Sequence, residues 1–486
     1  MAKRTAIIDI GSNSIRLVVY EKSSRFAFRL LHEVKSRVRL SENAYQNDLS
    51  LQEEAMQRTV DALTCFSDII NSYKARKVLC VATSALRDAP NKNDFIARVK
   101  ESSGINIKVI SGEKEAYFGA LSCALLLPHK DAISIDIGGG SCEIALIKDS
   151  SIDHTLSLKL GTVRLKELFL DSGDIDGAKK YIRSSLESLE IPKDLKVIGV
   201  GGTFRALAQI IMQNSKYPLD KLHGFSFNID EFKLLAKDIL DANKSKLKTL
   251  GVKKDRLDVI QSGTLILLEL LKYFNTKDLV TSGVGVREGV YLADLLRNSK
   301  HKFPANYNPS VRYLLDVHNI QDERTNSMAK ISKAIFEAIN STELHEKYKR
   351  VVVIASKLSK VGSSIHYYSY HKHSFYMIQS ALEYGFTHEE VVLISMLARF
   401  QKKKYPNDEF INKFETLLPN ERVLKLLTFI VTLSSMLSIN SSKHSKMNIS
   451  FNNDILEVGF ENLNTHLIKE QVLKLTMPDG IEVKIS

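Results

Sequence analysis

The sequence lacks the features of a membrane protein and of a disulfide-rich secreted protein. No apolar run approaches the eighteen or so residues that a membrane helix needs. The opening stretch, MAKRTAIIDIG, has no signal-peptide h-region and no small-residue cleavage site. The four cysteines, Cys65, Cys80, Cys123 and Cys142, show no CxxC spacing, which disfavours disulfides and a zinc site. We expect a cytoplasmic protein with reduced thiols and no membrane partner.

The charged residues show no local excess of the kind that forms a nucleic-acid-binding arm. The formal net charge is +12 over 486 residues, and it is not gathered in a tail. A positive charge permits an anionic partner such as a phosphate polymer. We therefore expect no specific nucleic-acid partner.

Composition and length indicate a folded, multidomain protein. Hydrophobic residues make up 44% of the chain and charged residues 26%, as in ordinary globular proteins. Up to about residue 300, short β-branched runs alternate with helical patterns, which is typical of an α/β protein. Strands are predicted at 5–11, 16–21, 105–111, 132–138 and 142–149, and helices at 51–74, 91–104 and 112–127. A strand with a polar loop is predicted over 77–88, and a strand, glycine turn and helix over 195–213 and 277–296.

Two domain boundaries are expected. Pro128 and the polar residues after it interrupt the helix over 112–127, and the α/β pattern ends near residue 299. The predicted domains are therefore 1–128, 129–299 and 310–486. The third is expected to be helical from 311 to about 440, with strands over 446–460 and a final hairpin over 473–486 that turns at Asp479 and Gly480.

One segment occurs twice. AIIDIGSNSIRLVVYE (6–21) and AISIDIGGGSCEIALIKD (132–149) each contain an apolar strand, an aspartate, a turn of small residues and a second apolar strand. The alignment pairs Asp9 with Asp136, Gly11 with Gly138, Ser12 and Asn13 with Gly139 and Gly140, and Ser14 with Ser141. Glycine and serine at a tight turn let backbone N–H groups approach phosphate oxygens closely. One copy alone could be an ordinary hairpin, but two predict a cleft that grips a polyphosphate from two sides.

The two copies differ seven residues after the aspartate, where the first has Arg16 and the second has Glu143. An aspartate beside a phosphate-binding turn can hold a divalent cation, so Asp9 and Asp136 are candidate ligands. Because Asp136 and Glu143 form a pair of carboxylates, we expect Mg²⁺ at the second copy. The alternative is that Glu143 is a solvated strand residue.

Four motifs in this order, DIGSNSIRLVVYE, DIGGGSCEIAL, GVGGTFRAL and TSGVGVREG, resemble the actin-like, sugar kinase and Hsp70 ATPase superfamily. Within it they resemble the exopolyphosphatase and guanosine pentaphosphate phosphohydrolase family over residues 1–300, and more loosely beyond. The resemblance implies two actin-like (ribonuclease H-like) α/β domains that face a cleft, followed by a mainly helical, HD-like C-terminal domain with a small β end. It also implies a Mg²⁺-dependent hydrolase that removes the terminal phosphate of inorganic polyphosphate or the 5′ γ-phosphate of pppGpp.

The resemblance assigns roles to single residues. The family's general base corresponds to Glu115 in SGEKEA, whereas the residues alone do not decide between Glu113 and Glu115, since the helix dipole favours both first-turn acids. Arg87 in ATSALRD corresponds to an arginine that lines the phosphate channel; the alternative is a surface arginine. Gly201, Gly202 and Thr203 match a further phosphate-side loop, and Arg287 and Glu288 match a hallmark with an expected structural role.

The helical region departs from the pattern of an HD-type metal site. No His-Asp dipeptide occurs in the chain, and Ser359 and Lys360 stand where the long family members resemble LHE-x-G. Because a protonated lysine cannot bind a cation, a dinuclear metal centre is disfavoured. His366, His371 and His373 lie close together in the sequence. His371, Lys372 and His373 are expected on a surface that faces anionic substrate, or as a cap of the helix that follows. The domain is expected to guide substrate and to form a homodimer.

Two other functions stay open. An actin-like ATP-dependent small-molecule kinase would need an adenosine pocket, and the sequence shows no obvious pattern for such a pocket beyond GVGGTF. A non-catalytic sensor of (p)ppGpp or polyphosphate would have no need of Glu115 beside two phosphate-binding turns. The sequence favours hydrolysis by activated water, with the two turns and Mg²⁺ holding the phosphates.

Overall fold

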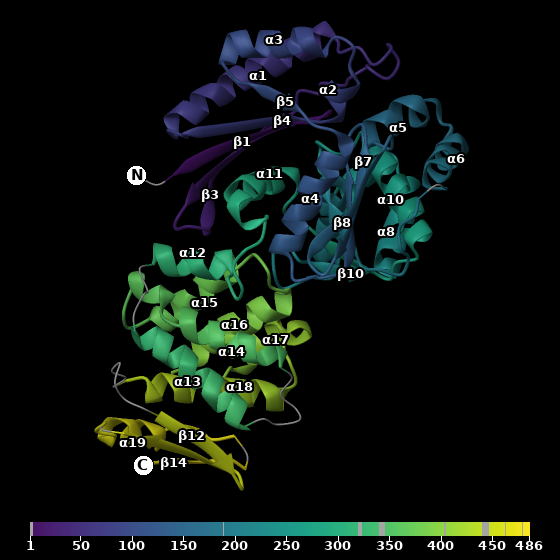
Figure 1. Ribbon diagram of the computed structural model, residues 1–486. Helices are drawn as coiled ribbons and strands as arrows, with labels where there is room; N and C mark the ends of the chain where they lie inside the picture. The colour runs from purple at the N-terminus through teal and green to yellow at the C-terminus, as the bar shows by residue number, and fades with distance from the viewer. Residues whose placement is uncertain are drawn as a thin grey trace. The chain divides into compact units, whose positions relative to one another are not determined.

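The structure is a computed structural model that describes residues 3–187, 189–318, 323–339, 346–402, 405–439, 447–461, 463–478 and 480–486. The chain divides into two compact units, Met1–Asn306 and Tyr307–Ser486 (Figure 1). Among the described residues, no helix is both long enough and apolar enough to cross a membrane.

The first unit begins with a five-stranded mixed sheet in the order β3-β2-β1-β4-β5. Its strands are β1 (Arg4–Ile10), β2 (Ile15–Lys22), β3 (Phe28–Ser36), β4 (Lys77–Ala82) and β5 (Ile107–Val109). Strand β1 pairs antiparallel with β2 and parallel with β4. Alternate residues of β1 (Ala6, Ile8 and Ile10) share a core with α1 (Glu53–Ser72) and α3 (Lys92–Ser103), which cover one face of the sheet (Figure 1). Asp9 therefore projects toward the opposite face.

A six-stranded sheet follows, in the order β10-β11-β9-β6-β7-β8. Its strands are β6 (Ala132–Ile137), β7 (Cys142–Lys148), β8 (Ser151–Leu158), β9 (Val197–Val200), β10 (Ser226–Asn228) and β11 (Asp278–Thr281). Its main core includes residues of α5 (Thr162–Leu168), α6 (Ile175–Leu186), α7 (Gly201–Asn214), α8 (Ile229–Leu240), α9 (Lys244–Thr249) and α10 (Ile260–Phe274). These helices place the GVGG turn, at the junction of β9 and α7, next to the end of β6.

The two copies of the duplicated segment form the same hairpin. In the first, Asp9 lies opposite Arg16 and the N–H of Gly11 donates to the carbonyl of Ser14 (3.2 Å). In the second, Asp136 lies opposite Glu143 and Gly138 N–H donates to the Ser141 carbonyl (2.9 Å). The predicted correspondence is therefore confirmed in both strand register and turn geometry.

Helices α4 (Gly112–Leu126) and α11 (Val286–Leu295) pack against each other and connect the two sheets. Although α4 precedes residue 128, it packs on β6, β7 and β8, while α11 packs on β1. The helices approach closely at Gly289, where a Cβ would overlap the backbone of Phe118. The pair positions the first turn of α4 and the start of α11 where the two sheets meet.

The second unit is mainly helical and ends in a small sheet. Its helices are α12 (Pro309–Val317), α13 (Glu323–Ile339), α14 (Lys347–Leu358), α15 (Tyr370–Ala381), α16 (His388–Phe400), α17 (Asp408–Lys413), α18 (Glu421–Leu437) and α19 (His466–Val472). The stretch over 446–460, predicted as strand, contains β12 (Met447–Asn452) and β13 (Ile455–Phe460), which pair antiparallel. Buried residues of this sheet, Leu456 and Val458, join the core of the helices.

Two local predictions are wrong. In the described part of 473–486, β14 (Glu482–Ile485) pairs in parallel with β13 and not with a strand directly before it; the predicted turn residue Asp479 lies outside the described residues. The polar loop predicted after β4 is a short helix, α2 (Ser84–Asp88). The first error arises because pairing with β13 overrides the local hairpin pattern.

Candidate active site

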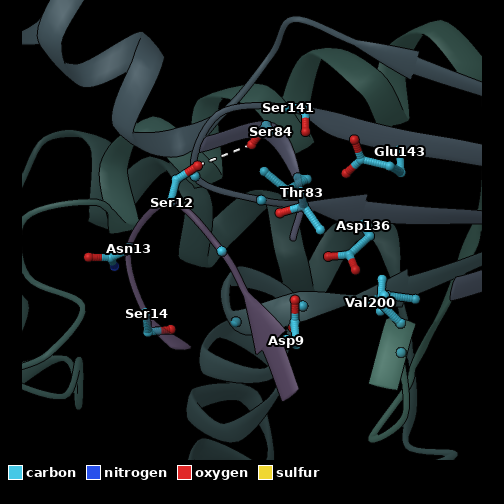
Figure 2. A pocket seen from close by; sticks show the side chains of 18 of the residues that line it. Asp9, Ser12, Asn13, Ser14, Thr83, Ser84, Asp136, Ser141, Glu143 and Val200 are labelled. Carbon is cyan, nitrogen blue, oxygen red and sulfur yellow. Dashed lines mark hydrogen bonds between the residues drawn. The ribbon is translucent and has the colours of Figure 1, made fainter. Parts of the chain in front are cut away.

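A cavity of about 150 Å³ lies where the duplicated hairpins of the first unit meet (Figure 2). Figure 2 shows Asp9, Asp136 and Glu143 with their carboxylates turned toward the same space, and the Ser12 to Ser14 turn along one side. Its polar walls come from β1, β2, β6, β7, α4, α7 and α11. Ser12 Oγ lies 3.1 Å from Ser84 Oγ, which fixes the first turn against α2.

Most residues that the sequence predicted for the site line this cavity. They are Asp9, Gly11, Ser12, Asn13, Ser14, Glu115, Asp136, Gly138, Gly139, Ser141, Glu143 and Gly202. Gly140 and Thr203 do not line it. Gly140 packs beneath its turn against Tyr45 and Ser84, and Thr203 is buried against Gly263. Arg87 also lies outside the lining but reaches it through hydrogen bonds.

Glu115 stands in the first turn of α4, and the structure separates it from Glu113. Ser111 caps the helix by accepting a hydrogen bond from the N–H of Lys114 (3.2 Å). Glu115 is buried and lines the cavity, whereas Glu113 is exposed. Burial and the neighbouring Glu143 carboxylate raise the pKa of Glu115 well above its ordinary value, and Arg87 only partly offsets them.

Arg87, in α2, contacts the carboxylates of both Glu115 and Glu143. Its guanidinium donates to Glu115 Oε2 (3.0 Å) and to Ser141 Oγ (3.4 Å), and it lies 4.0 Å from Glu143 Oε1. A planar guanidinium that holds two partners has little freedom to turn. Arg87 thus fixes the rotamer of Glu115 at the cavity wall.

Asp136 and Glu143 are carboxylates in a poorly solvated place. Burial is the main cause that raises the pKa of Asp136 to about 6 and that of Glu143 to about 7. Burial likewise raises the pKa of Asp9. Ser157 donates to Glu143 Oε1 (2.8 Å), which orients that carboxylate. A bound cation would favour the ionised form of each of these carboxylates.

The carboxylates suit a magnesium ion better than a metal held wholly by protein. Within the described ranges, no group of three or more His, Cys, Asp or Glu has the geometry of a metal site. Mg²⁺ commonly takes one or two carboxylates and completes its shell with water and phosphate oxygens. Asp136 and Glu143, adjacent across β6 and β7, offer that set, with Asp9 on the facing strand.

Four arginines line the same cavity: Arg16, Arg205, Arg256 and Arg287. The sequence motifs assign none of them to substrate and predict a structural role for Arg287. Glu33 accepts from both Arg16 (2.9 Å) and Arg287 (2.7 Å) and holds them side by side. Burial, together with Arg16 and Arg287, lowers the pKa of Arg205 to about 10. Arg16 and Arg205 stood within the quoted motifs, whereas no motif contained Arg256.

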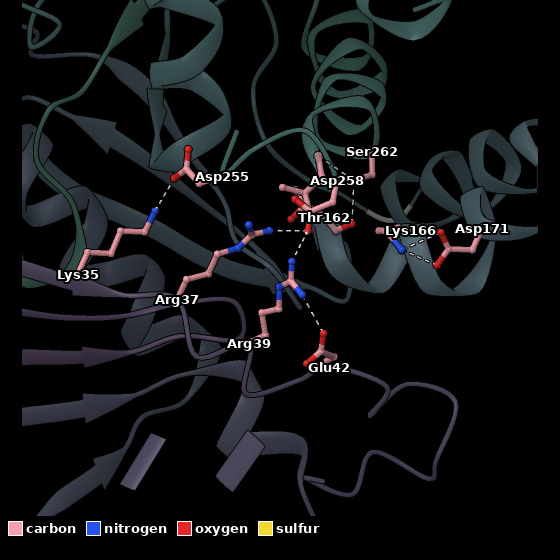
Figure 3. A network of polar contacts seen from close by, with 11 residues as sticks. Lys35, Arg37, Arg39, Glu42, Thr162, Lys166, Asp171, Asp255, Asp258 and Ser262 are labelled. Atoms are coloured by element: carbon pink, nitrogen blue, oxygen red, sulfur yellow. Dashed lines mark hydrogen bonds and ion pairs between the residues drawn. The ribbon is translucent and has the colours of Figure 1, made fainter. Parts of the chain in front are cut away.

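Ion pairs join the residues that flank Arg256 to a segment far away in the chain, and Figure 3 shows Lys35 beside Asp255 and Arg37 beside Asp258. Lys35 pairs with Asp255 (2.9 Å) and Arg37 with Asp258 (2.5 Å), one residue before and two after Arg256. The guanidinium of Arg256 approaches Gly202 so closely that a Cβ there would overlap it. Glycine at 202 therefore makes room for this arginine.

In the second unit, the three histidines of the HD-like region do not form a metal site within the described residues. His366 is exposed, and His371 and His373 lie in the first turn of α15. Burial and the nearby Lys402 and Arg399 lower the pKa of His371. Ser369 is the N-cap residue of α15, so the alternative in which His371, Lys372 or His373 caps this helix is wrong.

Comparison with protein families identifies the chain. Residues 18–298 match the model described as the Ppx/GppA phosphatase family, and residues 308–477 match Ppx/GppA phosphatase, domain III. This chain belongs to the Ppx/GppA phosphatase family. Its order of domains is therefore that of the family, with the α/β region followed by domain III.

Two curated relatives of this Ppx/GppA chain differ in the share of their own length that the chain matches. A bifunctional 3-dehydroquinate synthase/phosphatase of Fusobacterium nucleatum is 34% identical over 297 residues, which are 57% of this chain and 44% of that protein. The chain thus spans less than half of that relative. A guanosine-5'-triphosphate,3'-diphosphate pyrophosphatase of Pseudoalteromonas translucida is 26% identical over 483 residues, 94% of this chain and 92% of that protein.

Solved Ppx/GppA structures share the fold of the α/β region. A family member from Aquifex aeolicus is 28% identical with a TM-score of 0.53, covering 63% of this chain and 100% of its own. An exopolyphosphatase from Cytophaga hutchinsonii has a TM-score of 0.54 at 24% identity over 60% of this chain and 98% of its own. The predicted family and the actin-like α/β fold with a helical C-terminal region are confirmed.

Proposed function

We propose that this chain is a Mg²⁺-dependent phosphohydrolase that releases the terminal phosphate of inorganic polyphosphate or the 5′ γ-phosphate of pppGpp. The observation that carries the proposal is one cavity in which four arginines and two glycine and serine turns surround four carboxylates. Guanidinium and backbone N–H groups bind phosphate oxygens, while carboxylates bind a cation or activate water. Family membership and the pyrophosphatase relatives support the same reaction.

Glu115 is proposed to activate the water molecule. A general base works best when its pKa lies near the working pH, and burial moves the Glu115 pKa upward in that direction. Water would attack the terminal phosphorus as the phosphoanhydride P–O bond breaks, with the water proton passing to Glu115 and the electron pair to the leaving phosphate oxygen. Arg87 would hold the carboxylate in place and offset charge on the phosphate.

Asp136 and Glu143, with Asp9 opposite, are proposed to hold Mg²⁺. When bound, the ion would neutralise phosphate charge. The two turns, with Gly138 and Gly11 at their starts, would direct backbone N–H groups at the phosphates. The arginines that line the cavity would bind the remaining phosphate oxygens.

The test is phosphate release from long-chain polyphosphate and from pppGpp, measured in parallel with and without Mg²⁺. We expect release from at least one substrate that depends on the cation and needs no acceptor. Absence of release from both substrates would reject the proposal.

The kinase and sensor alternatives make different predictions when ATP and a candidate acceptor are added to the same phosphate-release assay. A kinase would consume ATP only with an acceptor present, and a sensor would bind without release. The buried Glu115 beside the phosphate turns favours hydrolysis over both. The homodimer and the cytoplasmic location stay predictions, which size measurement in solution and cell fractionation can test.

A further inference from the structure

A second cavity, of about 430 Å³, lies in the first unit and shares no residue with the candidate active site. It is formed by the start of β1, the end of β2, the turn after it, the start of β4, and the C-terminal end of α11 with the residues that follow. Fourteen residues line it, of which seven are Lys or Arg and one, Asp294, is acidic. A cavity with this balance of charge suits an anion.

The two cavities occupy opposite ends of strand β1. Thr5, which lines the second cavity, pairs with Lys77, whereas Ile10, next to the active-site turn, pairs with Ala82. Five residues of extended strand separate Thr5 from Ile10, or about 16 Å. A ligand in the second cavity is therefore distinct from the phosphates held by the duplicated turns.

Several of the cations in this cavity have no counter-charge. Arg4 pairs with Glu21, and Lys77 and Arg297 share Asp294. In the part of the chain that the structure describes, Lys3, Lys22 and Arg25 form no ion pair. Burial, and then the neighbouring cations Lys3, Arg25 and Arg297, lower the pKa of Lys22 despite the nearby Asp294. An anion would relieve this repulsion.

Tyr291 provides an independent indication of a ligand. Its side chain lines the cavity and is 2% exposed, and its ring stacks on Tyr20 with centroids 4.5 Å apart. Its buried hydroxyl has no hydrogen-bond partner among the described residues. A buried hydroxyl without a partner costs about 1–3 kcal/mol, so a missing acceptor is expected. A phosphate oxygen would be that acceptor.

We infer that this cavity is a second anion site, which binds a chain of two or more linked phosphates without cleaving it. Its cations come from four separate segments, which suits an anion with charge spread over several groups better than a single phosphate. Its one acid, Asp294, is already paired with Lys77 and Arg297, so the cavity offers neither a free base nor a pair of carboxylates for a metal. The inference goes beyond the proposed hydrolysis and does not rest on it.

The experiment measures tripolyphosphate binding by calorimetry in a Glu115→Gln background, so that hydrolysis does not consume the ligand. The pocket variant is Lys22→Glu with Arg297→Glu. The control is Lys180→Glu with Lys237→Glu, two exposed lysines outside the cavity that change the net charge by the same amount. We expect binding at one site to weaken at least tenfold in the pocket variant and to persist in the control. Equal binding by the two variants would overturn the proposal.

A second variant, Tyr291→Phe, separates ligand binding from folding. Without ligand, its Tm should equal or exceed that of the parent, because the unpaired hydroxyl is gone. With tripolyphosphate, its rise in Tm should be smaller. A full ligand-induced rise in Tyr291→Phe would contradict the role of the hydroxyl.

The same phosphate chemistry could come from inorganic polyphosphate or from a nucleotide. Displacement of bound tripolyphosphate by GTP distinguishes the two sources. If GTP displaces it at a concentration tenfold below that of competing tripolyphosphate, the ligand is assigned as a nucleotide. If the two competitors are needed at equal concentrations, the site recognises the phosphate chain alone. Both results support the site. Orthophosphate binding as tight as that of tripolyphosphate would overturn the assignment to linked phosphates. Phosphate release by the wild-type protein is a separate readout, so failure here leaves the proposed hydrolysis standing.

Discussion

The guanidinium of Arg87 donates a 3.0 Å hydrogen bond to Oε2 of Glu115, and this contact joins α2, beside the first sheet, to α4, which packs on the second. The proposed base is thus held by a residue from the other half of the unit. Its pKa reflects a balance in which burial and Glu143 raise it and Arg87 lowers it. Substitution of Glu115 should therefore change the rate, and substitution of Arg87 should change the pH dependence of the rate.

Replacing Glu115 with glutamine should abolish most phosphate release while leaving the fold intact. Glutamine has nearly the same shape and keeps an acceptor for Arg87, but it cannot take a proton from water. Loss of a general base typically costs about 10²–10⁴-fold in rate. The control is Glu113→Gln, an exposed acid two residues earlier on the same helix. Comparable rates for the two variants would remove Glu115 from its proposed role.

Arg87→Gln should shift the acid limb of the pH–activity profile to higher pH. Without the guanidinium, the cause that lowers the Glu115 pKa is lost, so the carboxylate stays protonated further into the neutral range. Arg87→Lys keeps the charge and should leave the acid limb closer to that of the wild type, although it cannot form the same fork of hydrogen bonds. An unshifted limb in Arg87→Gln would show that this ion pair does not tune the base.

Asp136→Asn should raise the stability of the protein above neutral pH in the absence of Mg²⁺. The pKa of Asp136 in the folded state, about 6, exceeds its ordinary value of 3.8, so the folded state binds the proton more tightly. The contribution of Asp136 to the free energy of unfolding is fully present below about pH 4. It falls by on the order of 3 kcal/mol as the pH rises through about 6. Asparagine removes that loss.

The measurement for Asp136→Asn is the Tm between pH 4 and 8, with and without Mg²⁺. The wild type should lose Tm with rising pH and recover it when Mg²⁺ is added, whereas the variant should do neither to the same extent. A higher Tm for the wild type than for the variant at pH 8 without Mg²⁺ would mean that other groups already compensate the charge of the ionised Asp136 carboxylate.

The sequence predicted the duplicated hairpins because their pattern is local: a strand, an aspartate, a small-residue turn and another strand. It did not predict β3 as a strand, since this segment has only one fully buried residue, Phe28, and lacks a clear alternation. Yet β3 carries Glu33, which orders Arg16 and Arg287 at the cavity. The positions of Arg16 and Arg287 therefore could not be predicted, because they depend on tertiary contacts that the periodicity of the sequence does not reveal.

Arg256 illustrates the same limit more strongly. It lies in no recognisable motif, and it reaches the cavity because ion pairs to Lys35 and Arg37 fix its flanking residues and because Gly202 leaves space for its guanidinium. The glycine turn itself could be predicted from GVGGTF. Its partner could not, since the two are separated by more than fifty positions and meet only in the folded chain.

These ion pairs lead to the final prediction, that Asp258→Asn should weaken substrate binding more than it weakens folding. Partly exposed ion pairs contribute about 0–1 kcal/mol each to stability, so the Tm should change little. The segment around Arg256 would lose its contact with Arg37, and KM should rise several-fold while kcat stays near that of the wild type. In an Arg256→Ala background, the same substitution should add almost nothing to KM, because the arginine that it positions is absent. Additive effects on KM would show instead that Asp258 acts independently of Arg256.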